Sequence, residues 1–183
     1  MTNSAIHHGQ GFGVQVKKSR EVTFSNNVVY HFFEHGLKVE GSYFVTLDNN
    51  RIGHIGPSWD DQFAYFTWKD FKGGAVGLTE GGNGDLVVRN NVAFGANYYG
   101  FEYNALKCDD RLAPTTVFEN NIAHSIAGYG FIALPSGRGG DCTEVSYLKG
   151  YKNKLATVAA TNRELECHDL VTVGSGFGIA CMG

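Results

Sequence analysis

Four pairs of adjacent asparagines, each inside a run of β-branched and aromatic residues, constrain the fold of this chain most strongly. Asparagine is depleted in strand interiors and common in turns, so each pair should end one strand before the next begins. A device repeated four times in 183 residues indicates a repeat architecture. The pairs lie in "VTFSNNVVY" (22–30), "VTLDNNRIG" (45–53), "LVVRNNVAFG" (86–95) and "TVFENNIAHS" (116–125).

The asparagine pairs belong to a longer unit that ends in a glycine and a further alternating strand. These final strands read "HGLKV", "YGFEY" and "YGFIA", and "QGFGVQV" (10–16) and "GSGFGIA" (174–180) look like two more copies. The second asparagines of the pairs are 23, 41 and 30 residues apart, a period typical of solenoids, and no helical stripe accompanies them. The sequence therefore predicts an all-β fold: a right-handed single-stranded parallel β-helix of about six or seven coils. Residues 1–183 would form one domain, a segment of a larger chain.

The second asparagine of each pair has a predicted structural role at a corner between two sheets. Asparagine tolerates the left-handed backbone conformation that a sharp bend requires. Its side-chain amide can also bond the equivalent amide one coil away, at the strand spacing of about 4.8 Å. A polar ladder inside the coil is expected from Asn27, Asn50, Asn91 and Asn121.

Strand alternation predicts which side chains of the first full coil face the interior. One set should point inward and the intervening residues outward. The inward set is Val22, Phe24, Val28, Leu37 and Val39, and the outward set is Thr23, Ser25 and Lys38.

Residues 53–74 interrupt the repeat and are predicted to form an inserted loop. The segment "GHIGPSWDDQFAYFTWKDFKGG" is dense in aromatic residues, and long loops in compact repeats are often functional. Trp59, Trp68 and Tyr65 are candidate stacking platforms for a glycan. The alternative is that these aromatic side chains only cover one face of the coil.

The order of the elements resembles the parallel β-helix region of the fibrocystin and fibrocystin-like family of large cell-surface proteins. The resemblance covers residues 4–145 and is carried by "SAIHHGQGFGVQVKKSREVTFSNNVVYHFFEHGLKVEGS" (4–42), "GHIGPSW", "VVRNNVAFGANYYGFEYNALKC" (87–108) and "GRGGDC" (137–142). After Leu148 the clear pattern is lost. The resemblance implies an extracellular or cell-surface scaffold, in several lineages tied to cilia or cell coats. Its partners would be other segments of the same large protein or neighbouring copies stacked end to end, and cell-surface glycans.

The four cysteines also favour an oxidising compartment. An even number without a C-x-x-C pair suggests two disulfides, and four buried thiols are the alternative. Cys108 and Cys142 both follow the final strand of consecutive coils, which predicts a Cys108–Cys142 bridge. Cys167 and Cys181 can close a second, smaller loop. The first residues lack the basic start and apolar core of a secretory signal, so any signal would lie outside this segment.

A carbohydrate-active enzyme is the main competing interpretation, because β-helices also carry polysaccharide lyases and hydrolases. The candidate acids are Asp60 and Asp61 in the insertion and Asp109 and Asp110 beside Arg111. Each pair consists of sequence neighbours, which would face opposite sides of a strand, so solvated loop charges are the simpler explanation.

Other chemistry receives little support from the sequence. Three histidines follow the asparagine corners at similar offsets, namely His31, His54 and His124, and stacking would bring them roughly into line. Hydrogen bonding at a polar corner is the commoner role for such histidines, and we expect no metal site and no cofactor. A formal net charge of −3 without basic runs also argues against a nucleic-acid partner.

Overall fold

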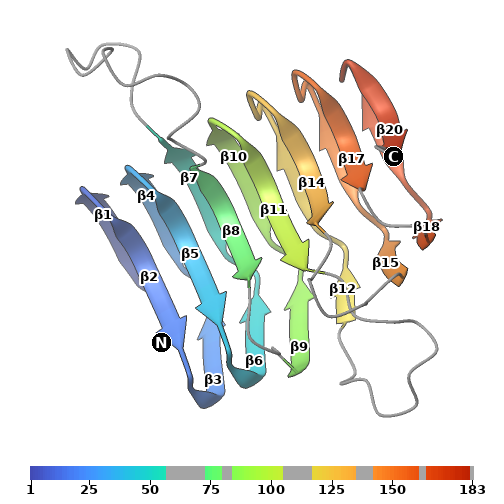
Figure 1. Cartoon of the computed structure of the whole chain (residues 1–183). Coiled ribbons are helices and arrows are strands. Elements are labelled where there is room, and N and C mark those ends of the chain that lie inside the picture. Colours follow the sequence, from blue (N-terminus) through green and yellow to red (C-terminus); the bar gives the residue numbers. More distant parts are fainter. Residues whose placement is uncertain (57–72, 80–83, 105–116, 135–141, 161–163, 182–183) are drawn as a thin grey trace.

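The computed structural model describes residues 1–56, 73–79, 84–104, 117–134, 142–160 and 164–181 of this chain. In these ranges twenty strands wind into a stack of coils, and every described strand pairing is parallel (Figure 1). Four coils pass through a first sheet (A), turn at an asparagine pair into a second sheet (B), and then turn into a third sheet (C). The last two coils begin in a separate sheet (D) and turn into sheet B without an asparagine pair. The predicted all-β parallel β-helix is confirmed, with seven strands in each of the two longest sheets.

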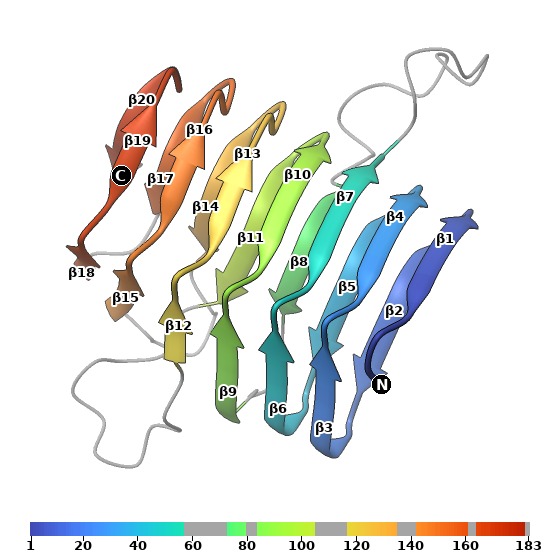
Figure 2. The same ribbon diagram turned by 180° about the vertical axis from the view of Figure 1, so that it is seen from behind.

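The strands of sheets A and B meet at the asparagine corner (Figure 2). Sheet A contains β3 (Arg20–Ser25), β6 (Tyr43–Asp48), β9 (Gly84–Arg89) and β12 (Val117–Glu119). Sheet B contains β1 (Ala5–Gly9), β4 (Val28–Phe32), β7 (Arg51–Ile55), β10 (Val92–Ala96), β13 (Ile122–His124), β16 (Lys149–Tyr151) and β19 (Val171–Val173).

Sheet C contains the strands that the sequence repeat shows as glycine-led copies. They are β2 (Phe12–Lys17), β5 (His35–Glu40), β8 (Gly74–Thr79), β11 (Tyr99–Asn104), β14 (Tyr129–Leu134), β17 (Ala156–Ala160) and β20 (Phe177–Cys181). A two-stranded sheet D is formed by β15 (Cys142–Ser146) and β18 (Glu164–His168). The coils thus continue beyond Leu148, where the sequence pattern fades.

The two asparagines of each pair have different roles at the corner. The first asparagine takes the left-handed conformation, with φ between 53° and 58° at Asn26, Asn49, Asn90 and Asn120. The second asparagine of each pair is buried. A further left-handed residue follows five positions later, as at His31 and His54, and turns the chain toward sheet C. Asparagine and histidine are among the non-glycine residues that occupy this conformation most readily.

The core is a continuous column of apolar side chains between the three sheets. Leu37 and Val39 of β5 are fully buried, and the ring of Phe118 meets Phe101 and Phe131 edge-on at 5.3 and 5.0 Å. Edge-to-face contacts of this kind add about 0.5–1.5 kcal/mol beyond burial of area.

The predicted inward position of Val28 is wrong. Val28 is 38% exposed, and Val29 is buried instead. Strand alternation does not continue through the corner, because left-handed Asn26 resets the phase and Asn27 points inward after it. Val22, the first of the predicted inward residues, is only partly buried.

The predicted insertion is narrower than 53–74. Gly53, His54 and Ile55 belong to β7, where they pair with β4 and β10, and Gly74 begins β8. Residues 57–72 of the insertion lie outside the described residues. In the described part of the chain, no helix is long and apolar enough to cross a membrane.

Candidate functional site

The longest segments between strands directly precede or follow strands of sheet C in the sequence, so we considered the outer face of this sheet first. The segments outside the described ranges each precede or follow a strand of this sheet: 57–72 and 80–83 around β8, and 105–116, 135–141 and 161–163 after β11, β14 and β17. The turns between sheets A and B are, by contrast, uniformly short. Functional residues concentrate where loops vary on a rigid scaffold, which directs attention to this face.

On this face, polar side chains of β5 and β11 meet in a cluster above glycine residues of the intervening strand β8. His35 of β5 and Tyr99 of β11 both pair in register with Gly74 of β8, which lies between them. The His35 Nε2 atom lies 2.7 Å from the Tyr99 hydroxyl oxygen. A Cβ atom on Gly74 would overlap the Tyr99 ring, and one on Gly77 would lie 3.2 Å from His35 Cδ2. The two glycines therefore let the side chains meet across β8.

Burial sets the charge of His35. The side chain is half-buried, and burial, followed by the positive charge of Lys38, lowers the pKa of His35 to about 4. The imidazole is consequently neutral near pH 7.

Tyr99 and Glu102 complete the cluster. Tyr99 is only 2% exposed, and its burial, reinforced by the charge of Glu102, raises the pKa of the Tyr99 hydroxyl well above 10. Glu102 hydrogen-bonds this hydroxyl and is itself buried, at 9% exposure. Because an ionised carboxylate only accepts, the Tyr99 hydroxyl donates to Glu102.

With Glu102 ionised, this order of hydrogen bonds selects one tautomer of His35. With its proton committed to Glu102, the Tyr99 oxygen accepts from the Nε2–H of His35. The Nδ1 atom of His35 is then an unprotonated acceptor, and it is buried without a hydrogen-bond partner in the part of the chain described. A buried, unsatisfied acceptor costs about 1–3 kcal/mol, which a hydroxyl donor can recover.

Apolar and aromatic groups surround the cluster. Lys38 Nζ lies 5.3 Å from the centre of the Phe12 ring. On the far side of Tyr99, Tyr98 contacts both Tyr99 and Tyr129 edge-on. A few polar groups set among aromatic rings are typical of a surface that binds a polar, carbon-rich ligand.

The four asparagines predicted at the corner form one hydrogen-bonded column inside the coil. The Nδ2 atoms of Asn27, Asn50 and Asn91 donate to the Oδ1 atom of the next asparagine at 3.1, 3.0 and 3.2 Å, ending on Asn121. Each Oδ1 atom also accepts a backbone N–H of the preceding coil, such as Asn27 N to Asn50 Oδ1 at 3.0 Å. All four side chains are at most 1% exposed, so they serve the stack rather than a ligand.

Most other residues singled out in the sequence lie outside the described residues. These are the glycan-stacking candidates Trp59, Trp68 and Tyr65, the candidate acids Asp60, Asp61, Asp109 and Asp110, and Cys108. Their roles stay predictions.

The cysteine pairings stay predictions. Cys167 of β18 is half-buried and packs against the core. Cys167 and Cys181 lie on β18 and β20, which belong to different sheets of the last coil. Cys142 lies in β15, and its pairing with Cys108 is untested.

The predicted histidine line is made of two neighbouring columns. His31 and His54 are in ring contact at 5.5 Å, whereas His124 pairs in register with Phe94 and belongs to the adjacent column. Among the described residues, no three His, Cys, Asp or Glu side chains are grouped so that they can hold a metal ion.

His35, Tyr99 and Glu102 were not predicted from the sequence as site residues. The available signal was the pair Gly74 and Gly77, which stand where the equivalent strands carry His35 and Lys38, or Tyr99 and Glu102. The sequence does not show which residues of neighbouring coils lie beside these glycines. The glycines alone therefore did not indicate that His35 and Tyr99 meet across β8.

Comparison with known proteins agrees with the fold described above. Residues 1–105 match the family model described as the right handed beta helix region. No curated protein matches the chain.

Proposed function

Because the chain belongs to the right-handed β-helix family, we propose that it acts as a rigid, non-catalytic scaffold of the extracellular or cell-surface, fibrocystin-like type. The observation that carries the proposal is the asparagine column, which ties four coils together from inside through side-chain and backbone hydrogen bonds. Such a column stiffens the stack, because bending would break buried hydrogen bonds.

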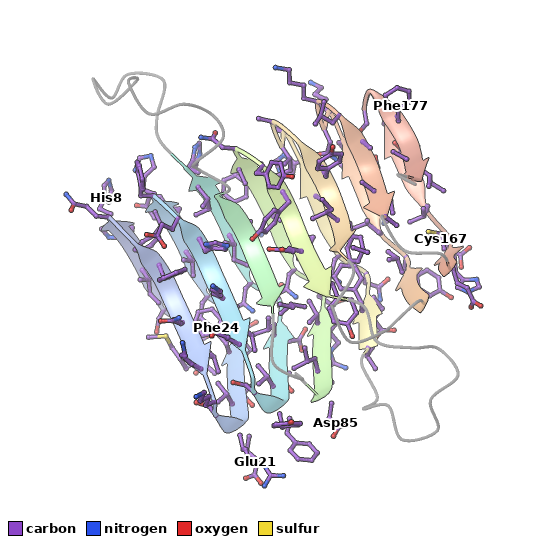
Figure 3. All side chains as sticks on the ribbon, in the orientation of Figure 1. His8, Glu21, Phe24, Asp85, Cys167 and Phe177 are labelled. Atoms are coloured by element: carbon purple, nitrogen blue, oxygen red, sulfur yellow. The ribbon has the colours of Figure 1, made fainter. Side chains whose placement is uncertain are left out.

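The partners of such a scaffold would be other segments of the same large protein or neighbouring copies that continue the stack. The last coil supports this, since Phe177 and Ile179 of β20 are 66% and 50% exposed. Figure 3 shows Phe177 on this last coil. Strands with an unpaired edge and apolar side chains readily pair with further strands.

Sedimentation velocity over a range of protein concentrations tests this association. We expect elongated, end-to-end species whose population falls when Phe177→Ser and Ile179→Ser are combined. The matched control is Tyr43→Ser with Phe44→Ser, which also removes two exposed apolar side chains but from the side of the coil. Association that is equally sensitive to both double variants would contradict stacking through the last coil.

A second candidate function, glycan binding or carbohydrate chemistry on the outer face of sheet C, rests on the unsatisfied Nδ1 atom of His35. A sugar hydroxyl can donate to this acceptor while its ring lies against neighbouring aromatic side chains.

Incubation with neutral and acidic polysaccharides, followed for both chain length and co-elution, separates the possibilities. Co-elution lost in His35→Phe would support a glycan-binding module at this face. Shortened chains, lost when Asp60 and Asp61 or Asp109 and Asp110 are changed to alanine, would overturn the non-catalytic scaffold. If the polysaccharides neither co-elute with the protein nor become shorter, the second candidate function is contradicted.

A further inference from the structure

Sheet B presents a continuous line of rings on its outer face. His8, His31, His54, Phe94 and His124, here called the ring track, come from β1, β4, β7, β10 and β13. Successive ring centres are 4.8, 5.5, 5.4 and 5.6 Å apart. The track follows the stacking direction, and Figure 3 shows its first member, His8, at the end of the first strand.

A glycine lets the track pass from one column to the next. Phe94 pairs in register with Gly53 of β7, and a Cβ atom on Gly53 would lie 2.5 Å from the Phe94 ring. The bare glycine therefore allows Phe94 to lean across β7 and meet His54 edge-on. On the first strands, His7 and Tyr30 stack beside the track at 5.2 Å.

The charge of this face has one sign. None of the seven strands of sheet B contains Asp or Glu, whereas β7 carries Arg51, β16 carries Lys149, and Lys152 follows β16. All three of these cations are exposed, as are His8, His31 and His54. The inner rows of sheet B, by contrast, are apolar: Val29, Ile52 and Ala93 are buried.

Among the described residues, the carboxylates nearest to sheet B lie beyond its corners. On the sheet A side, Asp48 is held by Arg89 at 3.1 Å and by Asn90 at 2.9 Å. Glu119 and Asp169 precede β13 and β19, and Glu34 follows β4. The track histidines contact one another, His7, Tyr30, Phe94 and Ser125.

We propose that the outer face of sheet B is a binding surface for a linear acidic polysaccharide, with sugar rings lying along the ring track and their acidic groups facing Arg51, Lys149, Lys152 and the exposed histidines. The repeat of the rings matches an extended polymer, because neighbouring coils are about 4.8 Å apart. This surface is distinct from the sheet C face, and the inference holds whether or not sheet C binds a glycan.

Two other polyanionic partners fit less well. Nucleic acid is bound through the release of many counterions, and three permanent cations on a chain of net charge −3 offer few. A membrane surface requires apolar side chains that insert into the acyl region, whereas the track carries four imidazoles among its five rings.

Titration of the full chain with polygalacturonate tests the proposal, with neutral dextran as the uncharged comparison. We expect saturable binding of polygalacturonate to the parent protein. Raising the salt from about 0.1 M to about 0.5 M should weaken it. Binding of dextran as tight as that of polygalacturonate would overturn the role of charge.

The decisive variant combines His31→Asn and His54→Asn. Asparagine suits the left-handed backbone at both positions, so the rings are removed without strain. We expect the affinity for polygalacturonate to fall at least about fivefold, and further with Arg51→Gln.

The matched control is Lys18→Asn, which removes an exposed cation from a left-handed residue at the corner between sheets C and A. It should keep the affinity within about twofold of the parent. Unchanged binding in the double variant, or equal losses in variant and control, would overturn the proposal. Lys38→Gln on sheet C separates the two faces, because a loss of affinity there, together with unchanged binding in the double variant, would place the site on sheet C rather than on sheet B.

Discussion

Adjacent asparagines solve two problems at one corner of this β-helix. The first residue supplies the left-handed backbone that the bend requires, and the second satisfies backbone N–H groups that the bend buries. A hydrophobic residue at the second position would leave those donors without acceptors. This explains why the column ends where Leu148 and Leu170 replace asparagine, beside Tyr147 and Asp169 at the left-handed position.

We predict that Asn50→Ala lowers the free energy of unfolding by about 2–4 kcal/mol. The Asn50 side chain accepts from both nitrogens of Asn27 and donates to the Phe24 carbonyl and to Asn91 Oδ1, so its loss leaves several buried groups unsatisfied. Urea-induced unfolding measures the change. Asn49→Gly, which keeps the left-handed backbone at the exposed neighbour, should cost less than about 1 kcal/mol. Equal costs at the two positions would contradict the division of roles.

His35 should make stability depend on pH. Its folded-state pKa of about 4 lies below the unfolded value of about 6.5, so the unfolded chain binds more protons between these values. Stability is then fully present above about pH 6.5 and is lost as the pH falls toward 4. After allowance for its partial exposure, we expect His35 to contribute about 2 kcal/mol to this loss.

Unfolding curves of the parent and of His35→Gln at several pH values test the effect. Glutamine can still donate to the Tyr99 oxygen but does not titrate. The difference between the two proteins should therefore change across this window, and parallel pH profiles would contradict the assignment.

At the scale of the strands, glycines decide which side chains meet across the coils. Gly74 of β8 lets Tyr99 reach His35, and Gly53 of β7 lets Phe94 reach His54. At Gly74 the central strand of three has no outward side chain, and side chains of its two neighbours meet over it. At Gly53 the Phe94 ring instead lies over the glycine and reaches His54 on the same strand. The candidate surfaces on sheets C and B therefore depend on the missing side chains at Gly74 and Gly53, respectively.

Gly74→Ala should displace Tyr99 and destabilise the fold by about 1–3 kcal/mol, because the new methyl group has no room. Near-ultraviolet circular dichroism reports the tyrosine environment, and thermal unfolding reports the stability. Gly11→Ala is the control, since a Cβ atom there meets nothing within 4 Å. An unaltered tyrosine signal in Gly74→Ala would mean that the Tyr99 ring does not lie across β8.

Across the whole molecule, the interior changes from apolar to polar along the stack. The position filled by Phe32, Ile55 and Ile126 in earlier coils is taken by Asn153. Thr157 is fully buried, and its hydroxyl lies 2.6 Å from that of Thr172. The last coil is the most exposed, with all three residues of β19 open to solvent.

Amide hydrogen exchange should follow this gradient. Repeat proteins are stabilised by contacts between neighbouring coils, so strands with fewer buried contacts open more often. We expect β19 and β20 to exchange faster than β10 and β11, with β16 and β17 between them, when followed by mass spectrometry. Uniform protection along the stack would contradict a gradient of local stability.

The sequence by itself determined the fold class, because asparagine pairs and glycine-led strands recur with a period that only a stack of short parallel strands accommodates. It could not give the phase of the strands after a corner, as Val28 shows, since one left-handed residue reverses the alternation. Nor could it show the His35–Tyr99 contact or the ring track. His35 of β5 and Tyr99 of β11 are 64 residues apart in the sequence. His54 of β7 and Phe94 of β10, which are neighbours in the track, are 40 residues apart. Only the register between coils, set by backbone pairing in three dimensions, brings such distant side chains into contact.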